Sequence, residues 1–190
     1  MTERGMIFNG EMVRAILDGR KTQTRRPIKW KQTRFTEIGE REDGSKWPWS
    51  EDAEHACDFW HPCPFGAVGD RIWVRETWNK YGGLLTYRAD HDWIDDMRKE
   101  TVCTAKWVPS IHMPRWASRI LLEITGVRVE RLRSMSQDDA RAEGVIAASG
   151  PMEAGLAFRE LWDSIYGEES WKANPWVWVI EFKRIEGGAA

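Results

Sequence analysis

The sequence is short of cysteine and lacks any long apolar run. Three cysteines in 190 residues are an odd number without the regular spacing of a disulfide framework, which is typical of a reducing compartment. No stretch resembles the apolar region of a signal peptide, and none is long enough to span a membrane. We therefore expect a cytoplasmic protein with no membrane partner.

An excess of either charge is also missing. The chain carries 28 basic and 30 acidic residues, a net charge of -2, so no overall field draws it to nucleic acid. RNA contact would need a local patch, which the sequence offers at Arg14, Arg20, Lys21, Arg25, Arg26, Lys29 and Lys31. Internal repeats are absent as well, and the length suits a single domain over residues 1–190.

What the sequence does contain is a basic motif, GRKTQTRR, at residues 19–26. Apolar residues at helical spacing predict a short helix over 11–18, and Gly19 suits its left-handed stop. The β-branched, polar residues that follow predict an extended segment, in which Lys21 and Thr24 point to opposite faces. A twist, bulge or turn at the strand entrance would let Lys21 and Thr24 converge. The alternative is a basic, solvated loop after a helix.

The remaining pattern predicts an α+β fold, a small mixed β-barrel with helices at its rim. Prolines, glycines and charges interrupt residues 28–66, which we expect to be a long loop insertion. Alternating residues predict strands over 71–78, 84–89, 119–132 and 176–185, with a bulge at Gly126. A capping pattern predicts a helix over 136–143, and a second helix follows Pro151.

A compact group of metal-ligating residue types lies in the expected loop, namely His55, Cys57, His61 and Cys63. Zinc accepts such ligands, but the spacing matches no standard finger or ribbon. We therefore expect these side chains to pack in the loop, and we predict no metal and no cofactor.

Several polar and aromatic residues outside the basic motif are candidates for substrate binding. Glu76 shares a strand face with apolar residues, so it is either paired with an arginine or a substrate carboxylate. The two-proline segment at 107–116 displays His112, Arg115 and Trp116. Thirteen tryptophans fill the core or provide stacking surfaces, as Trp78 could.

The motifs together resemble the ASCH domain family, of the PUA-like superfamily. They are GRKTQTRR at 19–26, VGD at 68–70, DARAEG at 139–144 and WVIEF at 178–182. CPFG at 63–66, WVRETW at 73–78 and IHMPRWASR at 111–119 resemble its phage and prophage branch. The resemblance spans nearly the whole chain and is weakest over 30–60.

This resemblance implies a PUA-like barrel with a cleft facing the basic motif and a role in RNA or nucleotide binding. One type of member is an amidohydrolase that removes the acetyl group from N4-acetylcytidine. By that similarity, Lys21, Thr24 and Glu143 are the expected catalytic residues, and the substrate is a modified nucleoside or a small amide. The residues expected to bind substrate are Arg20, Arg26, Glu76, Trp78, His112, Arg115 and Trp116.

The chemistry is feasible for these residue types. A lysine activates a threonine hydroxyl only if its pKa falls from about 10.4 toward neutrality, through burial or nearby cations such as Arg25 and Arg26. Glu143 would relay a proton to the leaving amine or orient the attacking group, although its charge raises the pKa of Lys21. Alternatively, Thr24 only binds substrate and water attacks.

Two other functions stay open at the level of sequence. The first is a non-catalytic RNA-binding module, in which arginines contact phosphate and Trp78, Tyr87 and Trp116 stack on bases. The second is a metal-assisted ribonuclease.

Overall fold

The structure is a computed structural model that describes residues 1–29, 37–52, 54, 57–81, 83–91, 106–146 and 153–186. Its strands are β1 (Glu3–Ile7), β2 (Gln23–Pro27), β3 (Glu37–Glu40), β4 (Lys46–Asp52), β5 (Cys57–Trp60), β6 (Arg71–Arg75), β7 (Trp78–Tyr81), β8 (Leu84–Tyr87), β9 (Leu121–Arg131) and β10 (Trp176–Ile185). Its α-helices are α1 (Gly10–Leu17), α3 (Gln137–Ala142), α4 (Ala154–Tyr166) and α5 (Glu168–Ala173). Short 3-10 turns are η1 (Arg88–Asp90), η2 (Ser110–His112), η3 (Arg115–Ala117) and η4 (Leu132–Ser134).

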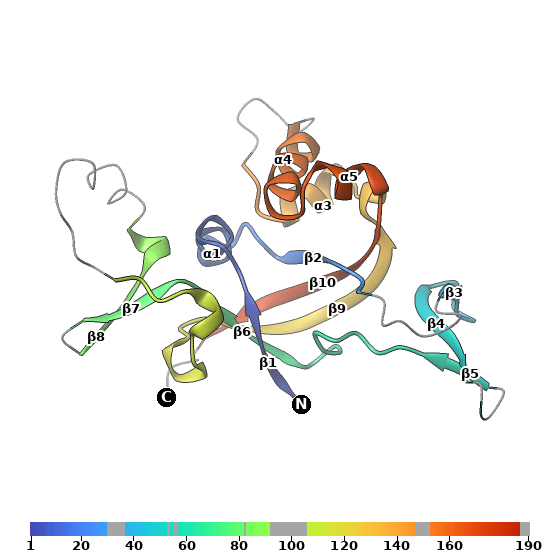
Figure 1. The fold of residues 1–190 in the computed structure, drawn as a ribbon, viewed down its shortest axis with the longest axis horizontal. Coiled ribbons are helices and arrows are strands. Elements are labelled where there is room, and N and C mark those ends of the chain that lie inside the picture. The colour runs from blue at the N-terminus through green and yellow to red at the C-terminus, as the bar shows by residue number, and fades with distance from the viewer. Residues whose placement is uncertain are drawn as a thin grey trace.

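A five-stranded sheet in the order β1-β6-β9-β10-β2 forms the centre of the molecule (Figure 1). β1 pairs parallel with β6, and the other pairs are antiparallel. The mixed α+β class is therefore confirmed. Among the described strands, however, β1 and β2 are the two edges and do not pair, so the closed barrel is not confirmed.

The bulge predicted at Gly126 is confirmed by the pairing of β9 with β10. Gly126 lies opposite Glu181, but the next partner of β10, Phe182, lies opposite Ile124. The three predicted helices are also present, as α1, α3 and α4.

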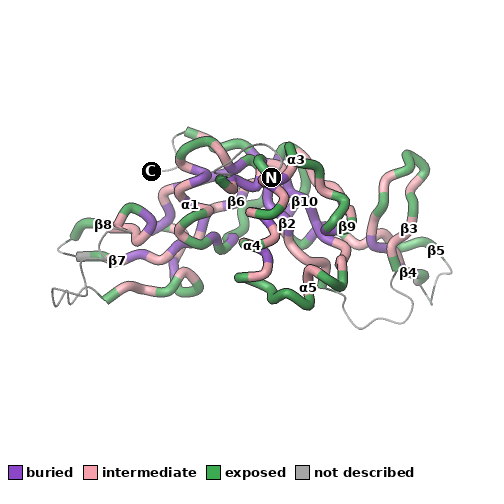
Figure 2. Tube along the Cα trace, turned by 90° about the horizontal axis from the view of Figure 1, so that it is seen from above, coloured by how far each residue is buried: buried purple, intermediate pink, exposed green. Residues whose placement is uncertain are grey.

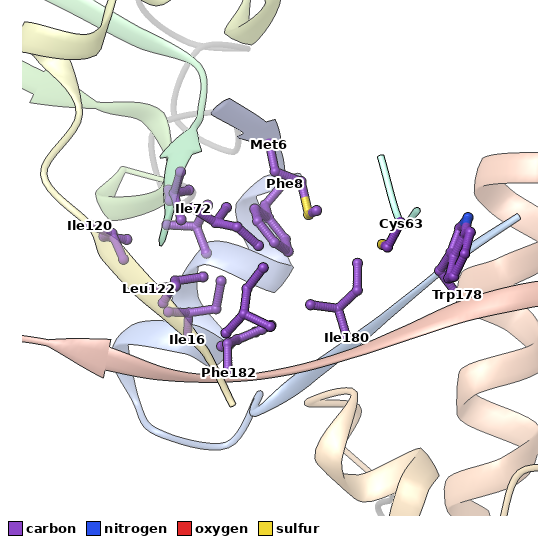
Figure 3. Packing of buried hydrophobic residues seen from close by; sticks show 14 of the residues in the cluster. Met6, Phe8, Ile16, Cys63, Ile72, Ile120, Leu122, Trp178, Ile180 and Phe182 are labelled. Carbon is purple, nitrogen blue, oxygen red and sulfur yellow. The ribbon is translucent and has the colours of Figure 1, made fainter. Parts of the chain in front are cut away.

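β10 is buried on both faces, which explains its nearly continuous apolar sequence. Trp178, Ile180 and Phe182 join the main hydrophobic core with α1, and Figure 3 shows Cys63 at the Trp178 end of this cluster. Val177 and Val179 join the second core, which packs against α3 and α4 (Figure 1). Each fully buried side chain of this size stabilises the fold by about 1.5–3 kcal/mol.

Two small sheets lie at opposite ends of the molecule (Figure 1), where much of the surface is exposed (Figure 2). One pairs β7 with β8, and the other has the order β3-β4-β5. The region expected as a loop over 28–66 thus contains three strands. Its β4 is joined to the main core by Trp47, whose ring packs edge-on against Trp178 at 5.0 Å.

Among the described residues, no helix combines the length and the apolar character that crossing a membrane requires.

Candidate active site

Lys21 and Glu143 form a buried ion pair beneath the N-terminal helix. Gly19, at φ 78°, ends α1 and directs the chain toward β2, while Glu143 caps the C-terminus of α3. The backbones of Lys21 and Glu143 form an isolated antiparallel bridge. Lys21 Nζ donates to Glu143 Oε2 and to the Glu143 carbonyl, each at 2.9 Å. Both side chains are at most 2% exposed, so this pair is shielded from solvent.

A second cation shares the Glu143 carboxylate. Arg25 Nη1 donates to Glu143 Oε1 at 3.0 Å, so each oxygen of Glu143 has its own cationic donor. Arg25 lies opposite Val179 in the pairing of β2 with β10, which directs its side chain toward the helices above the sheet. Arg25 Nη2 forms ion pairs with the carboxylates of Glu130 and Asp139, the latter at 3.6 Å. The Lys21 pair therefore belongs to a larger network of buried charges.

This environment lowers the pKa of Lys21. Burial is the largest cause, because it disfavours the ammonium, and the cations Arg26 and Arg25 add to it. Glu143 acts in the opposite direction through its charge and its hydrogen bond, without cancelling the effect of burial. The shift has the direction that a lysine base needs.

Thr24 lines a small cavity next to this pair. The cavity has a volume of about 150 Å³, and Thr24, Arg25, Arg26 and Glu143 form its polar wall. Its remaining lining is mainly apolar and comes from Ile7, Asn9, Met12, Phe158, Leu161, Trp162, Ile165 and Tyr166. Thr24 is 1% exposed, and its hydroxyl makes no hydrogen bond to any other described residue.

The Nε atoms of Arg25 and Arg26 are further buried donors without a partner among the described residues. Buried polar groups are normally satisfied, so these two donors, on residues that line the cavity, are candidates for contact with an oxygen-bearing ligand. Arg26 is otherwise held by the Ile7 carbonyl, at 2.7 Å from Nη2, and its guanidinium lies 5.1 Å from the centre of the Phe8 ring.

A larger cavity of about 550 Å³ shares Met12, Glu143 and Leu161 with the small one. Arg20 lines it and donates to the Gly144 carbonyl at 2.5 Å. The structure thus brings Arg20, Arg26, Thr24 and Glu143 to two adjoining cavities. Lys21 lines neither cavity and adjoins them through its ion pair with Glu143.

The other residues expected to bind substrate lie elsewhere. None of Glu76, Trp78, His112, Arg115 and Trp116 lines either cavity. Glu76 is buried and receives two hydrogen bonds, at 3.0 and 3.1 Å, from the arginine at position 119, the kind of partner that the sequence allowed.

The aromatic members of that group form a separate surface. Trp78 is 8% exposed and packs edge-on against Trp116, which is 62% exposed, at 5.5 Å. Arg115 pairs with Glu3 at 3.0 Å, and His112 is exposed. Burial of Trp78 removes one of the three stacking residues expected for an RNA-binding module.

The candidate metal ligands are not gathered in the described part of the chain. His55 lies outside the described residues. Cys57 is exposed, whereas Cys63 is buried in the main core, and His61 shares a hydrogen bond of 2.9 Å with Ser50. The described residues contain no group of three or more metal-ligating side chains.

The sequence interpretation did not assign a site role to Asp139, Glu130 and Arg128, which complete the charge network. Arg128 donates to Asp139 Oδ1 at 2.9 Å and to Glu181 at 2.6 Å. Arg128 and Glu130 are two positions apart in the predicted strand over 119–132, which is the spacing of one strand face, and Asp139 belongs to the capping pattern. No local signal showed that α3 lies over that face.

No family model matches the chain, and no curated protein matches it significantly. Among solved structures, the chain is similar to the crystal structure of an ASCH domain from Lactobacillus crispatus JV V101. The TM-score is 0.46 at 14% identity, over 96% of this chain and 79% of that chain. The similarity to the ASCH family therefore remains a resemblance of sequence motifs, and the chemistry of the site rests on its own geometry.

Proposed function

We propose that the chain is an amidohydrolase that removes the acyl group from N4-acylated cytosine nucleosides or related amides. The observation that carries this proposal is the buried Lys21, whose pKa is lowered and whose partner Glu143 lines the same cavity as Thr24. Buried titratable groups with shifted pKa values beside a cavity are candidates for acid and base chemistry. The substrate class comes from the motif resemblance.

The sizes of the two cavities fit the two parts of such a substrate. The larger, of about 550 Å³, is within the usual range of small-molecule sites and suits a nucleoside. The smaller, of about 150 Å³ and mostly apolar, suits the acyl group. Glu143 lines both, so the scissile amide would lie beside it.

The reaction begins when neutral Lys21 accepts a proton from the nucleophile. With Thr24 as nucleophile, its oxygen bonds to the acyl carbon. The bond from that carbon to the exocyclic nitrogen then breaks as the nitrogen gains, through Glu143, the proton that Lys21 accepted. Water then hydrolyses the threonyl ester, which releases the carboxylic acid and restores the hydroxyl. With water as nucleophile, the same acid and amine form without an ester. The unpaired Nε donors of Arg25 and Arg26 would stabilise the negative oxygen that develops in either case.

The test is the release of cytidine from N4-acetylcytidine by the whole purified chain, followed by chromatography. We expect turnover by the wild type and a loss of roughly 10²–10⁴-fold in Lys21→Ala, because a positioned base contributes that much. Lys183→Ala is the matched control, since Lys183 is exposed and, within the described part of the chain, pairs only with Glu123, at 3.2 Å. Absence of turnover by the wild type, or equal rates in wild type and Lys21→Ala, would contradict the proposal.

A further inference from the structure

A third cavity, distinct from the two that Glu143 lines, lies between the small sheet β3-β4-β5 and the main sheet. Its volume is about 480 Å³, and it shares no lining residue with the other two. The residues that define it are Arg4, Arg41, Trp47, Trp60, Cys63 and Asp70. The proposed hydrolase chemistry uses none of them.

Two tryptophans give this cavity aromatic walls that are fixed in place. Trp47 donates from Nε1 to the His61 carbonyl at 2.6 Å, and its ring packs against Trp178. Trp60 packs against Gly39 so closely that a Cβ at position 39 would lie 3.0 Å from its ring. Rings held in this way lose little conformational entropy when a ligand stacks on them.

Arg41 covers these walls with a planar cation. Its guanidinium lies 4.0 Å from the centre of the Trp47 ring and 5.5 Å from that of Trp60. Among the described residues it forms no ion pair, although its charge helps to lower the pKa of the neighbouring Asp43. A guanidinium stacked on an indole presents a second flat face, on which a nucleobase can stack in turn.

The charge of the cavity selects an anionic ligand. Arg4 and Arg41 supply two positive charges, and Asp70 supplies one negative charge. Asp70 is already engaged by the backbone amides of Thr2 and Ala67 and by Arg4, at 2.8, 3.1 and 3.4 Å. Among the residues that line the cavity, one positive charge remains, since Asp43 interacts with Arg41 from outside the lining. This charge disfavours a cationic ligand of the kind that aromatic cages bind, and it suits a phosphate.

We propose that this cavity binds a nucleotide, with the base stacked on the Arg41 layer and the phosphate held by Arg4 and Arg41. The same chemistry occurs in a free mononucleotide and in one nucleotide of a single-stranded RNA. The proposal gives a role to residues 37–60 that does not depend on hydrolysis at Lys21.

Isothermal titration calorimetry of the whole chain tests this site with four probes: AMP, adenosine, inorganic phosphate and a five-nucleotide oligoadenylate. We expect saturable binding of AMP and weaker binding of adenosine and of phosphate, because each carries only half of the recognised chemistry. Arg41→Gln should weaken AMP binding by at least about tenfold. Arg41→Lys should also weaken it, since it keeps the charge and loses the planar face.

Arg131→Gln is the matched control, because Arg131 also covers a tryptophan, Trp176, at 4.3 Å, and lines none of the three cavities. Lys21→Ala should bind AMP like the wild type, which separates this site from the hydrolytic one. Tighter binding of the oligoadenylate than of AMP would assign the site to RNA. Equal affinity for the two probes would assign it to a free nucleotide.

Three results would overturn the proposal. The first is the absence of saturable binding of AMP and of the oligoadenylate. The second is an equal loss of affinity for AMP in Arg41→Gln and Arg131→Gln. The third is binding of phosphate as tight as that of AMP.

Discussion

At the scale of single residues, a contribution to folding stability is a poor explanation for the buried Lys21–Glu143 pair. Taking two charges out of water costs several kcal/mol per ion, and apolar residues of similar size would often stabilise a fold equally well. The pair lies beside a cavity lined by Thr24, Arg25 and Arg26. The Thr24 hydroxyl and the Nε groups of both arginines have no hydrogen-bond partner among the described residues. A ligand that contacts these groups would account for both observations.

Thr24→Val distinguishes the two possible nucleophiles. Valine keeps the shape of threonine, and the hydroxyl has no hydrogen bond to any described residue, so the free energy of unfolding should change by less than about 0.5 kcal/mol. If Thr24 attacks the amide, cytidine release should fall at least about 100-fold, beyond what loss of one binding contact explains. A rise in KM with unchanged kcat would instead make water the nucleophile and leave Thr24 a binding role. Urea titration and steady-state kinetics measure the two quantities.

At the scale of elements, the site depends on how α3 ends against α1. Gly144 follows Glu143 with φ 89°, and a Cβ there would lie 2.7 Å from Ala15 and 2.8 Å from the side chain of Lys21. Only glycine lets the two helix ends approach closely enough for Lys21 to reach Glu143.

Gly144→Ala should therefore lower both stability and activity. Gly69→Ala is the matched control, because Gly69 has φ 92° but a Cβ at that position would meet no other atom within 4 Å. Both changes carry the backbone strain of about 1–2 kcal/mol, and the crowding at position 144 adds roughly 1–3 kcal/mol. Chemical unfolding of the two variants measures the difference, and equal losses would contradict the proposed packing.

Asp139 fixes the other end of α3. It closes a capping box with Ser136, through hydrogen bonds of 2.9 and 3.0 Å, and pairs with Arg128. Burial alone would raise the pKa of Asp139, but the Ser136 hydrogen bonds and the charges of Arg25 and Arg128 outweigh it and hold the pKa below 3.8.

Because the folded-state pKa is lowered, ionised Asp139 stabilises the fold fully above its unfolded pKa of about 3.9, and this stability is lost as the pH falls through the folded value. Asp139→Asn should cost about 1–2 kcal/mol at pH 7. The difference between wild type and variant should shrink below about pH 4. A difference that stays constant down to pH 2 in urea titrations would show that the charge is not the cause.

The elements themselves were predictable where the pattern was regular. Strand alternation identified β9 and β10, and the slip at Gly126 identified the bulge. The sheet β3-β4-β5 was missed because Pro48 lies in its central strand, where the lost amide normally argues against a strand. Trp47 and Trp49 alternate around that proline, but charges and glycines on both sides obscured the period.

At the scale of the whole molecule, long-range contacts were beyond the reach of sequence patterns. Lys21 and Glu143 are 122 positions apart, and only the motif resemblance suggested that they meet. The third cavity, for which we propose nucleotide binding, is a similar case. It brings Arg4 together with Trp47 of β4 and Trp60 of β5, which no single stretch of sequence connects.

The dependence of kcat/KM on pH for cytidine release from N4-acetylcytidine tests the central claim, that Lys21 acts as a neutral amine within its buried pair. Since the pKa of Lys21 is lowered, we expect kcat/KM to rise with pH to a plateau, with the midpoint of the rise below pH 10.5. Wild type and Lys183→Ala should show the same curve. A rate that falls over this range, or that shows no rising limb below pH 10.5, would contradict it.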